Sequence, residues 1–433
     1  MLMHFTPISS ILEGKETGKQ VLIRGWVYRK RSSGGMHFVV IRDSSGVIQC
    51  AVKKDAVSEK AFGDAEKTFI ESSITCAGTV SEDKRAPGGF EIKATDFSLV
   101  YLGEPFPIAK DQSVEFLLDT RHLWLRSQRL TNIMKARDYL TRYLREFLFS
   151  NDFWELSPPI ITRAGCEGGS TLFNVDYFGE QAYLTQSGQL YNEAFITSHE
   201  KVFILAPSFR AEPSRTVRHL CEYWHLEPEM AWVDNEGNMK VQEEMISYVC
   251  QKLAKERADL LKSLGRNPDD LLAVKPPFPR MSYLDACDKL EGMGLKMERG
   301  KDFGADEEAA LTKGLKTPLF VHHYPKGAKA FYMREDPEQK GYVLCADLLA
   351  PEGHGEVIGG SERIWDLSEL QKRMKEEKLE EKDYQWYVDL RRYGSVPHSG
   401  FGLGIERLVK WALNLDHIRD AVPFPRVLNR VYP

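Results

Sequence analysis

The sequence lacks the features of a secreted, metal-stapled or membrane protein. Its 433 residues include only seven cysteines, an odd number without a Cys-x-x-Cys pair, which argues against a disulfide framework and a structural zinc site. The longest apolar stretches, such as Val343–Ala350, fall far short of the ~20 residues of a spanning helix, and Asp347 interrupts that one. No basic segment followed by an apolar segment stands at the N-terminus. We therefore expect a cytoplasmic protein with reduced cysteines and no membrane partner.

Several nucleotide and hydrolase motifs are also missing. No Gly-x-x-x-x-Gly-Lys-Ser/Thr loop occurs, and the glycines of Gly400–Gly404 have the wrong spacing for a dinucleotide loop. There is no His-Glu-x-x-His, and Gly359–Arg363 lacks the last glycine of a Gly-x-Ser-x-Gly elbow. Because these motifs are missing, the sequence argues against an enzyme of hydride transfer, zinc proteolysis or serine hydrolysis.

The chain has little excess charge of either sign. Its net charge is −5, but residues 1–103 hold 14 basic and 12 acidic residues, so this part is at +2 and the remainder at −7. A local basic face binds phosphates whatever the global balance, because phosphate contacts depend on nearby cations. Charge alone therefore does not decide whether nucleic acid is a partner.

Short strands separated by glycine turns fill the first hundred residues. The expected strands are Lys19–Lys30, His37–Arg42, Val47–Val52, Ile74–Val80 and Phe90–Ala94. Five such strands predict a small barrel of the oligonucleotide-binding (OB) type. Aromatic and basic residues alternate along it, which favours single-stranded nucleic acid over a barrel without a ligand.

After a proline-rich linker the pattern changes to mixed helices and strands. Leu102–Pro107 carries two prolines, and helical spacing then appears between Ile133 and Phe147. Strands are expected at 182–185, 202–206, 225–233, 319–323, 342–349 and 356–358, and helices at 242–264 and 369–381. The fold class is therefore α+β. His322 and His323 sit on an apolar strand and are interpreted as packing residues.

Three segments in this part concentrate arginines, carboxylates and glycines. They are Phe209–Tyr223, Glu356–Arg363 and Gly400–Arg407, the last of which is expected to open an apolar helix. A planar guanidinium meets phosphate oxygens in pairs, and a carboxylate such as Glu356 holds Mg²⁺ against them. The segments together indicate a site for a nucleoside triphosphate.

These segments resemble the sequence motifs of class II aminoacyl-tRNA synthetases. Phe209-Arg-Ala-Glu212 with Arg218-His-Leu220 resembles motif 2, Gly402-Leu-Gly-Ile-Glu-Arg407 resembles motif 3, and Phe153–Pro159 resembles motif 1. The resemblance spans nearly the whole chain and indicates the aspartyl/asparaginyl subgroup. It implies an OB-fold anticodon-binding domain at 1–103, a linker at 104–125, and a catalytic domain at 126–433 whose antiparallel β-sheet is flanked by helices.

The segment Thr185–Glu193 decides between the two types of the subgroup. Aspartyl enzymes resemble Gln-Ser-Pro-Gln followed by a lysine, whereas this chain has Gly188 and Asn192 at those two places. A neutral Asn192 removes the charge that favours a substrate carboxylate. Gly359 stands where many aspartyl enzymes have a serine near the metal, so we assign it no side-chain role. The resemblance thus implies activation of L-asparagine with ATP and transfer to tRNA(Asn).

Roles of single residues follow from the resemblance. Arg210, Arg407 and Glu356 are the expected catalytic residues, with Glu356 on Mg²⁺, and Pro159 is expected at a homodimer interface. The expected ATP-binding set is Arg210, Glu212, Arg218, His219, Leu220, Tyr223, Glu356, Gly404, Ile405, Glu406 and Arg407. The expected amino-acid-binding set is Glu167, Gln186, Ser187, Gly188, Gln189, Asn192, Arg210, Glu212 and Arg363. Arg24, Phe38 and Gln49 are expected to contact the anticodon.

Three alternatives stay open at this point. An aspartyl or non-discriminating enzyme would share the chemistry, and a paralogue that forms amides would share the adenylate. A non-catalytic RNA-binding protein would share only the fold. The intact barrel argues against the second alternative, and the presence of Arg210, Glu356 and Arg407 together argues against the third.

Overall fold

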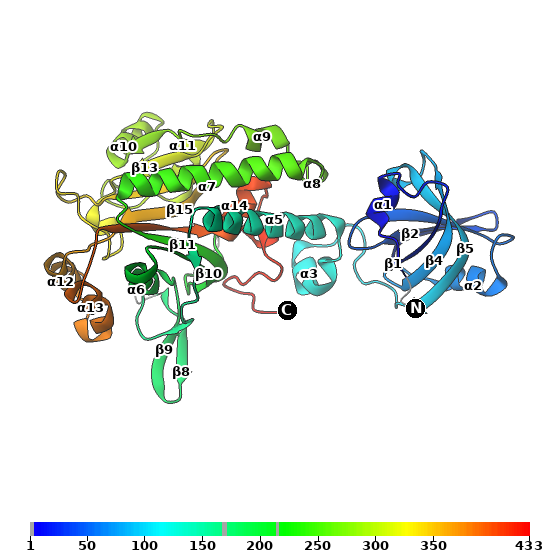
Figure 1. The fold of residues 1–433 in the computed structure, drawn as a ribbon, viewed down its shortest axis with the longest axis horizontal. Helices are drawn as coiled ribbons and strands as arrows, with labels where there is room; N and C mark the ends of the chain where they lie inside the picture. The colour runs from blue at the N-terminus through cyan, green and yellow to red at the C-terminus, as the bar shows by residue number, and fades with distance from the viewer. Residues whose placement is uncertain (1–3, 167–170, 214–215) are drawn as a thin grey trace. The chain divides into compact units, whose positions relative to one another are not determined.

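The computed structural model describes residues 4–166, 171–213 and 216–433, and the chain divides into two compact units. One unit reaches to Leu117 and the other begins at Leu118 (Figure 1). The predicted limits of 1–103, 104–125 and 126–433 are finer than this division and stay predictions. Within the described residues, no helix combines the length and apolar composition needed to cross a bilayer.

The first unit is a closed five-stranded barrel, which confirms the predicted OB fold. Its strand order is β1-β2-β3-β5-β4. The strands are β1 (Gln20–Ser33), β2 (Met36–Arg42), β3 (Val47–Lys53), β4 (Ser73–Glu82) and β5 (Phe90–Tyr101). Two helices that the sequence did not predict accompany them, α1 (Ile8–Leu12) and α2 (Glu59–Lys67). The Ser58 side chain caps α2 by accepting a hydrogen bond from the Ala61 amide.

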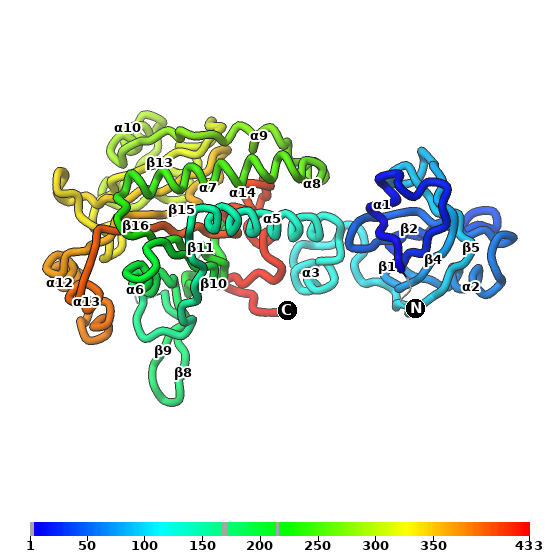
Figure 2. Tube along the Cα trace, viewed as in Figure 1, coloured from blue at the N-terminus to red at the C-terminus, as the bar shows by residue number. Residues whose placement is uncertain are grey.

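The second unit is built on an eight-stranded sheet of order β12-β13-β14-β15-β16-β11-β10-β6. Neighbouring strands are antiparallel except at the two edges, where β12–β13 and β10–β6 are parallel. The strands are β6 (Trp154–Glu155), β10 (Lys201–Phe209), β11 (Glu222–Ala231), β12 (Arg280–Ser282), β13 (Leu319–His322), β14 (Cys345–Ala350), β15 (Gly355–Glu362) and β16 (His398–Gly404). A small sheet of β7 (Ile161–Thr162), β9 (Glu180–Leu184) and β8 (Asn174–Tyr177) projects from this unit (Figure 2).

Two long helices, α5 (Gln128–Ser150) and α7 (Asn235–Glu256), lie side by side along the large sheet (Figure 1). Their apolar stripes share one core with Leu226, Leu348 and Leu403 of the sheet, so these helices cover one sheet face. Since strand side chains alternate between faces, the residues directly before and after each of these leucines in its strand point to the opposite face. That opposite face carries the candidate site.

The remaining helices surround this frame. They are α3 (Val114–Asp119), α4 (Arg121–Trp124), α6 (Gln189–His199), α8 (Ala258–Ser263), α9 (Pro268–Leu272), α10 (Tyr283–Gly292), α11 (Ala305–Thr312), α12 (Leu367–Glu376), α13 (Gln385–Arg392) and α14 (Ile405–Ala412). The single helix expected over 242–264 is two helices, α7 and α8, with Arg257 between them. The glycines of Gly400–Gly404 belong to β16, and the helix that they were expected to open starts only at Ile405.

Candidate functional site

The face of β11 that points away from α5 and α7 is lined with polar side chains. Tyr223, His225, Glu227 and Glu229 follow one another at every second position of the strand, so all four project from this face. His225, Glu227 and Glu229 are each at most 9% exposed. Two buried carboxylates on one strand face require partners, because burial of an unpaired charge is costly.

Glycines on the neighbouring strand β16 make room for these side chains. Gly400 pairs with Glu229 and Gly404 pairs with His225 across the ladder. A Cβ atom on Gly402 would collide with the His225 ring, and one on Gly400 would collide with the Glu229 carboxylate. Because these alternating glycines have no side chains, this face of the sheet stays open for a ligand to approach.

A register shift in β15 places Glu356 on the same face. Leu348 of β14 pairs with Ile358, but the next residue, Leu349, pairs with Glu356, so Val357 is an extra residue in β15. Such a bulge reverses the side to which the following side chains point. Without it, strict alternation from the core residue Ile358 would turn Glu356 toward α7.

Most of the predicted ATP-binding residues line one pocket. Arg210, Glu212, Arg218, His219, Leu220, Tyr223, Glu356, Gly404, Glu406 and Arg407 all contribute to its wall. Two nitrogens of Arg218, Nε and Nη1, are buried and have no hydrogen-bond partner within the described part of the chain. The Arg210 guanidinium lies 5.6 Å from the centre of the Tyr223 ring. Cations beside an aromatic ring suit the phosphates and base of a nucleotide.

The cations of this pocket are held by carboxylates, of which Glu356 is half-buried and Glu308 is buried. Arg407 Nη1 donates to Glu356 Oε2 over 2.7 Å, and Arg218 Nη2 lies 2.7 Å from Glu308 Oε2. Burial raises the pKa of Glu356, but the charge of Arg407 outweighs it and holds the pKa at about 2. Burial lowers the pKa of His219, and the surrounding arginines lower it further. The pocket therefore holds ionised Glu356 and a neutral imidazole.

A second carboxylate stands beside Glu356. A Cβ atom on Gly359 would lie 3.1 Å from Glu356 Oε1 and 3.5 Å from Asp347 Oδ1, so both oxygens face the space above this glycine. Lys329 Nζ binds the other Asp347 oxygen at 2.6 Å. Burial raises the pKa of Asp347 to about 7, although Lys329 opposes this shift. Paired carboxylate oxygens are the ligands that Mg²⁺ prefers, so these residues fit the expected ion.

A second pocket adjoins the first and shares Arg210, His225 and Glu356 with it. Ser187, Gln189, Glu227, Tyr332 and Arg363 complete much of its wall. Arg363 is bound through Nε and Nη2 to both oxygens of Glu229, at 2.9 Å each. Burial raises the pKa of Glu227, but the charge of His225 and hydrogen bonds from Ser187 and Gly188 leave it below its usual value. One wall thus offers a guanidinium and another an ionised carboxylate.

The other predicted residues occupy different places. Asn192 is fully buried, and its Nδ2 donates to the Glu227 backbone carbonyl at 2.7 Å. Gln186 donates to Thr171 Oγ1, and the Gly188 amide donates to Glu227. Ile405 is completely buried in the core. Glu212 lines the first pocket and is absent from the wall of the second.

Two predicted residues need separate mention. Glu406 is 1% exposed and accepts hydrogen bonds from Arg137 and from the Trp224 amide, so it ties α14 to α5 and β11. Glu167 lies outside the described residues.

In the barrel, Phe38 and Gln49 lie on the same outer face. The ladder pairs Phe38 with Ala51 and Val40 with Gln49, and the inward positions between them are Val39 and Cys50. Arg31 lies 4.4 Å above the Phe38 ring. Gln49 donates to Glu91 at 2.9 Å and is only 5% exposed. Arg24 is exposed on β1, over the ring of Phe5.

Three carboxylates are among the residues of the site that the sequence analysis missed, as are His225 and Tyr332 of the pocket walls. Glu227, Asp347 and Glu308 all carry carboxylates that are less than 10% exposed beside the pockets. A signal existed for Asp347, because it interrupts the apolar strand β14, where an ionised side chain has to be explained. Glu308 stands in a helix whose first turn is acidic, and no pattern separated it from its neighbours.

Comparison with known proteins assigns both units to families. Residues 21–100 match the profile of the OB-fold nucleic acid binding domain, and residues 113–428 match that of the class II tRNA synthetases (D, K and N). The asparagine–tRNA ligase of Thermoplasma acidophilum is 51% identical over 416 residues, covering 96% of this chain and 97% of the relative. That of Thermococcus gammatolerans is also 51% identical, over 96% of both chains.

Solved structures agree with this assignment. The asparaginyl-tRNA synthetase of Pyrococcus horikoshii, complexed with asparaginyl-adenylate, superposes with a TM-score of 0.94 at 48% identity and 97% coverage of each chain. An aspartyl-tRNA synthetase from Entamoeba histolytica gives a TM-score of 0.84 at only 26% identity, over 100% of this chain and 93% of that one. The chain therefore belongs to the class II aminoacyl-tRNA synthetases of the D, K and N group.

Proposed function

We propose that this protein is an asparagine–tRNA ligase, which activates L-asparagine with ATP and transfers it to tRNA(Asn). The observation that carries the proposal is the junction of the two pockets at Arg210 and Glu356. The reacting atoms, the α-phosphate and the substrate carboxylate, meet at such a junction when ATP fills the first pocket and the amino acid fills the second. No nucleophile from the protein is needed, because positioning and charge stabilisation lower the barrier.

In this proposal the first pocket holds ATP. Tyr223 stacks on the adenine, Arg218, His219 and Arg407 bind the outer phosphates, and Arg210 stabilises the negative charge that develops on the α-phosphate. Glu356 and Asp347 would hold Mg²⁺, which when bound neutralises charge on phosphate oxygens. Arg407 binds Glu356 Oε2 and Lys329 binds Asp347 Oδ2. The other oxygen of each carboxylate, which faces the space above Gly359, is therefore left for the ion.

The second pocket distinguishes an amide from a carboxylate. A side-chain amide has an oxygen that accepts from Arg363 and an NH₂ group that donates to Glu227, whereas aspartate would bring a second negative charge against Glu227. A site built around such directed hydrogen bonds rejects a wrong partner by up to ~10⁴–10⁵-fold. Gln189 and Ser187 would hold the α-ammonium end, and Glu167 is also proposed to bind the amino acid.

The barrel is proposed to bind the anticodon of tRNA(Asn) through Arg24, Phe38 and Gln49. An aromatic ring under an arginine on an open barrel face suits a stacked base held by its phosphate. We also propose a homodimer through the exposed edge of the large sheet at β6, where Trp154 is 60% exposed and Pro159 follows on the surface. Sedimentation would measure this state, and a monomer at micromolar concentration would contradict it.

The decisive experiment is ATP–pyrophosphate exchange with asparagine and aspartate in parallel, with Mg²⁺ and without tRNA. Exchange with asparagine alone is expected. Arg210→Met should abolish it, whereas Arg142→Met, which removes an exposed arginine whose ion pair is with Asp138, should not. Exchange with aspartate would contradict the amide selectivity. Absence of exchange with either amino acid would contradict the enzymatic proposal. Aminoacylation of tRNA transcripts that carry either the asparagine or the aspartate anticodon then tests the proposed specificity for tRNA(Asn).

A further inference from the structure

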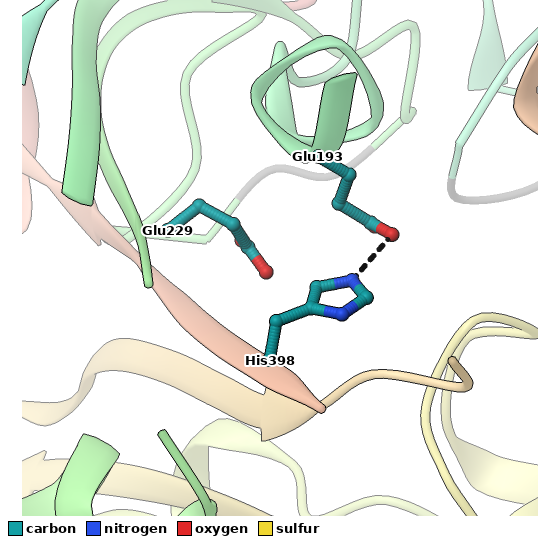
Figure 3. Close-up of side chains that lie close together, drawn as sticks. All are labelled: Glu193, Glu229 and His398. Atoms are coloured by element: carbon teal, nitrogen blue, oxygen red, sulfur yellow. Dashed lines mark hydrogen bonds and ion pairs between the residues drawn. The ribbon is translucent and has the colours of Figure 1, made fainter. Parts of the chain in front are cut away.

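Behind the amino-acid pocket lies a cluster of charged side chains that reaches the pocket wall through Arg363. Glu193 of α6, Glu229 of β11 and His398 of β16 bring one ligand atom each within 4.8 Å of one another (Figure 3). Arg363 and Arg391 complete the cluster, and all five side chains are at most 6% exposed. The carboxylates are already paired with guanidinium groups, so the cluster is an ion-pair network and not a metal site.

Glu193 is the centre of this network. Its two oxygens accept hydrogen bonds from Gln189 Nε2 at 2.7 Å, Tyr387 Oη at 2.8 Å, Arg391 Nη2 at 2.5 Å and His398 Nε2 at 2.8 Å. Burial raises the pKa of Glu193, but Arg391 and His398 outweigh it and place the pKa far below its usual value. Glu193 is therefore an ionised acceptor.

His398 is a cation in this arrangement. Its Nε2 faces the Glu193 carboxylate, and its Nδ1 faces the Val396 backbone carbonyl at 2.7 Å. Both of these partners only accept hydrogen bonds, so both ring nitrogens carry a proton. With Arg363, Arg391 and His398 positive and Glu193 and Glu229 negative, the buried cluster has a net charge of one positive unit.

The network ties together the two sides of the amino-acid pocket. On one side, the Glu193 carboxylate accepts only from the NH₂ end of Gln189, which leaves the carbonyl end of that amide for the pocket. On the other side, the Arg363 amide donates to the His398 carbonyl at 2.9 Å. Arg391, the second cation on Glu193, donates to the carbonyl of Ile364 at 2.7 Å. Glu193 thus fixes both Gln189 and the backbone that carries Arg363.

We infer that Glu193 is a positioning residue that sets the preference of the pocket for an uncharged side chain, an inference that rests on the proposed function. Its negative charge cancels one of the three cations of the cluster, which are Arg363, Arg391 and His398. Without that charge the cluster would hold two net positive units, and a substrate carboxylate would gain in affinity relative to an amide. Glu193 acts through Gln189, Arg391 and His398 and not through contact with the substrate.

The test is the ratio of kcat/KM for asparagine to kcat/KM for aspartate in ATP–pyrophosphate exchange. Glu193→Gln keeps the shape and removes the charge, and we expect the ratio to fall by about tenfold or more, through a lower KM for aspartate. Tyr387→Phe removes a hydrogen bond to Glu193 without changing any charge and is expected to keep the ratio within about twofold. His398→Gln alone should shift the ratio in the opposite direction.

The double variant Glu193→Gln/His398→Gln restores the original net charge and is expected to recover most of the preference for asparagine. A ratio that stays unchanged in Glu193→Gln, an equal effect of Tyr387→Phe, or a His398→Gln shift of the same sign would each overturn the inference. If Glu193→Gln does not fold, the direction in which His398→Gln shifts the ratio still tests the inference. Absence of wild-type exchange with asparagine would instead overturn the proposed function.

Discussion

Arg407 and Glu356, 51 positions apart in the chain, are joined by a 2.7 Å hydrogen bond between Nη1 and Oε2. The pair links the arginine of one predicted motif to the carboxylate of another. It also leaves the second oxygen of Glu356 facing Asp347 across Gly359. One ion pair thus aligns the cation that is proposed to bind the triphosphate with the carboxylates that are proposed to hold the metal.

Arg407→Met is expected to weaken ATP binding by about 10- to 100-fold, because a hydrogen bond to a charged group contributes ~1.5–3 kcal/mol. The substitution also leaves the half-buried Glu356 without its cation, so the Mg²⁺ requirement should change together with the KM for ATP. Exchange rates at varied ATP and Mg²⁺ measure both effects. Arg142→Met is the matched control, and an unaltered ATP dependence of Arg407→Met would contradict this role.

Asn192→Lys is expected to raise aspartate activation relative to asparagine by about tenfold or more. The side chain at this position is buried against the Glu227 carbonyl, so a lysine ammonium would arrive beside the carboxylate that faces the substrate amide. Asn192→Met supplies a similar volume without the charge and should lower both activities without reversing their order. Full retention of the asparagine preference in Asn192→Lys would refute the account of this position.

Phe38→Ala is expected to raise the KM for tRNA by about 5- to 100-fold, since stacking of a base on an aromatic ring contributes ~1–3 kcal/mol. Exchange without tRNA should keep its wild-type rate, because the barrel is a separate compact unit. Aminoacylation at varied tRNA concentration gives the first quantity. Loss of exchange in this variant would point to a folding defect instead of an anticodon contact.

Acidification from pH 7 to pH 5 is expected to destabilise the second unit through His354. Burial and the nearby Lys410 lower the pKa of this histidine to about 4, whereas the unfolded chain takes up the proton near pH 6.5. The unfolded state thus binds more protons in this window, and about 2 kcal/mol of stability is lost on acidification. His354→Gln keeps the hydrogen-bonding partners Lys410 and Asn414 within reach. Between pH 7 and pH 5 the free energy of unfolding of this variant should therefore fall by about 2 kcal/mol less than that of the wild type. Urea unfolding at both pH values measures the difference, and identical losses would disprove it.

Much of the fold follows from local patterns. Alternation between Val21 and Val27 and the glycine turns around Gly34 and Gly46 specify the barrel strands, because half-buried strands have a period of two. The helical stripe from Ile133 to Phe147 specifies α5 for the corresponding reason. The sequence analysis predicted the helix that follows the glycines at 400, 402 and 404, which α14 confirms, but it did not predict the strand β16 to which these glycines belong. Glycine before an apolar run is compatible with a helix start and with a crowded strand alike.

The sequence by itself predicted most of the residues that are proposed to carry the chemistry, because arginines, carboxylates and glycines at fixed spacing are chemical requirements of a triphosphate site. Only the tertiary structure decided how they face one another. The extra residue Val357 turns Glu356 to the functional face, and the ladder between β11 and β16 places Gly400 beneath Glu229. The Glu193 network joins residues up to 205 positions apart, from α6 to β16. Such partners are chosen by packing and by the pairing of buried charges, which no local pattern encodes.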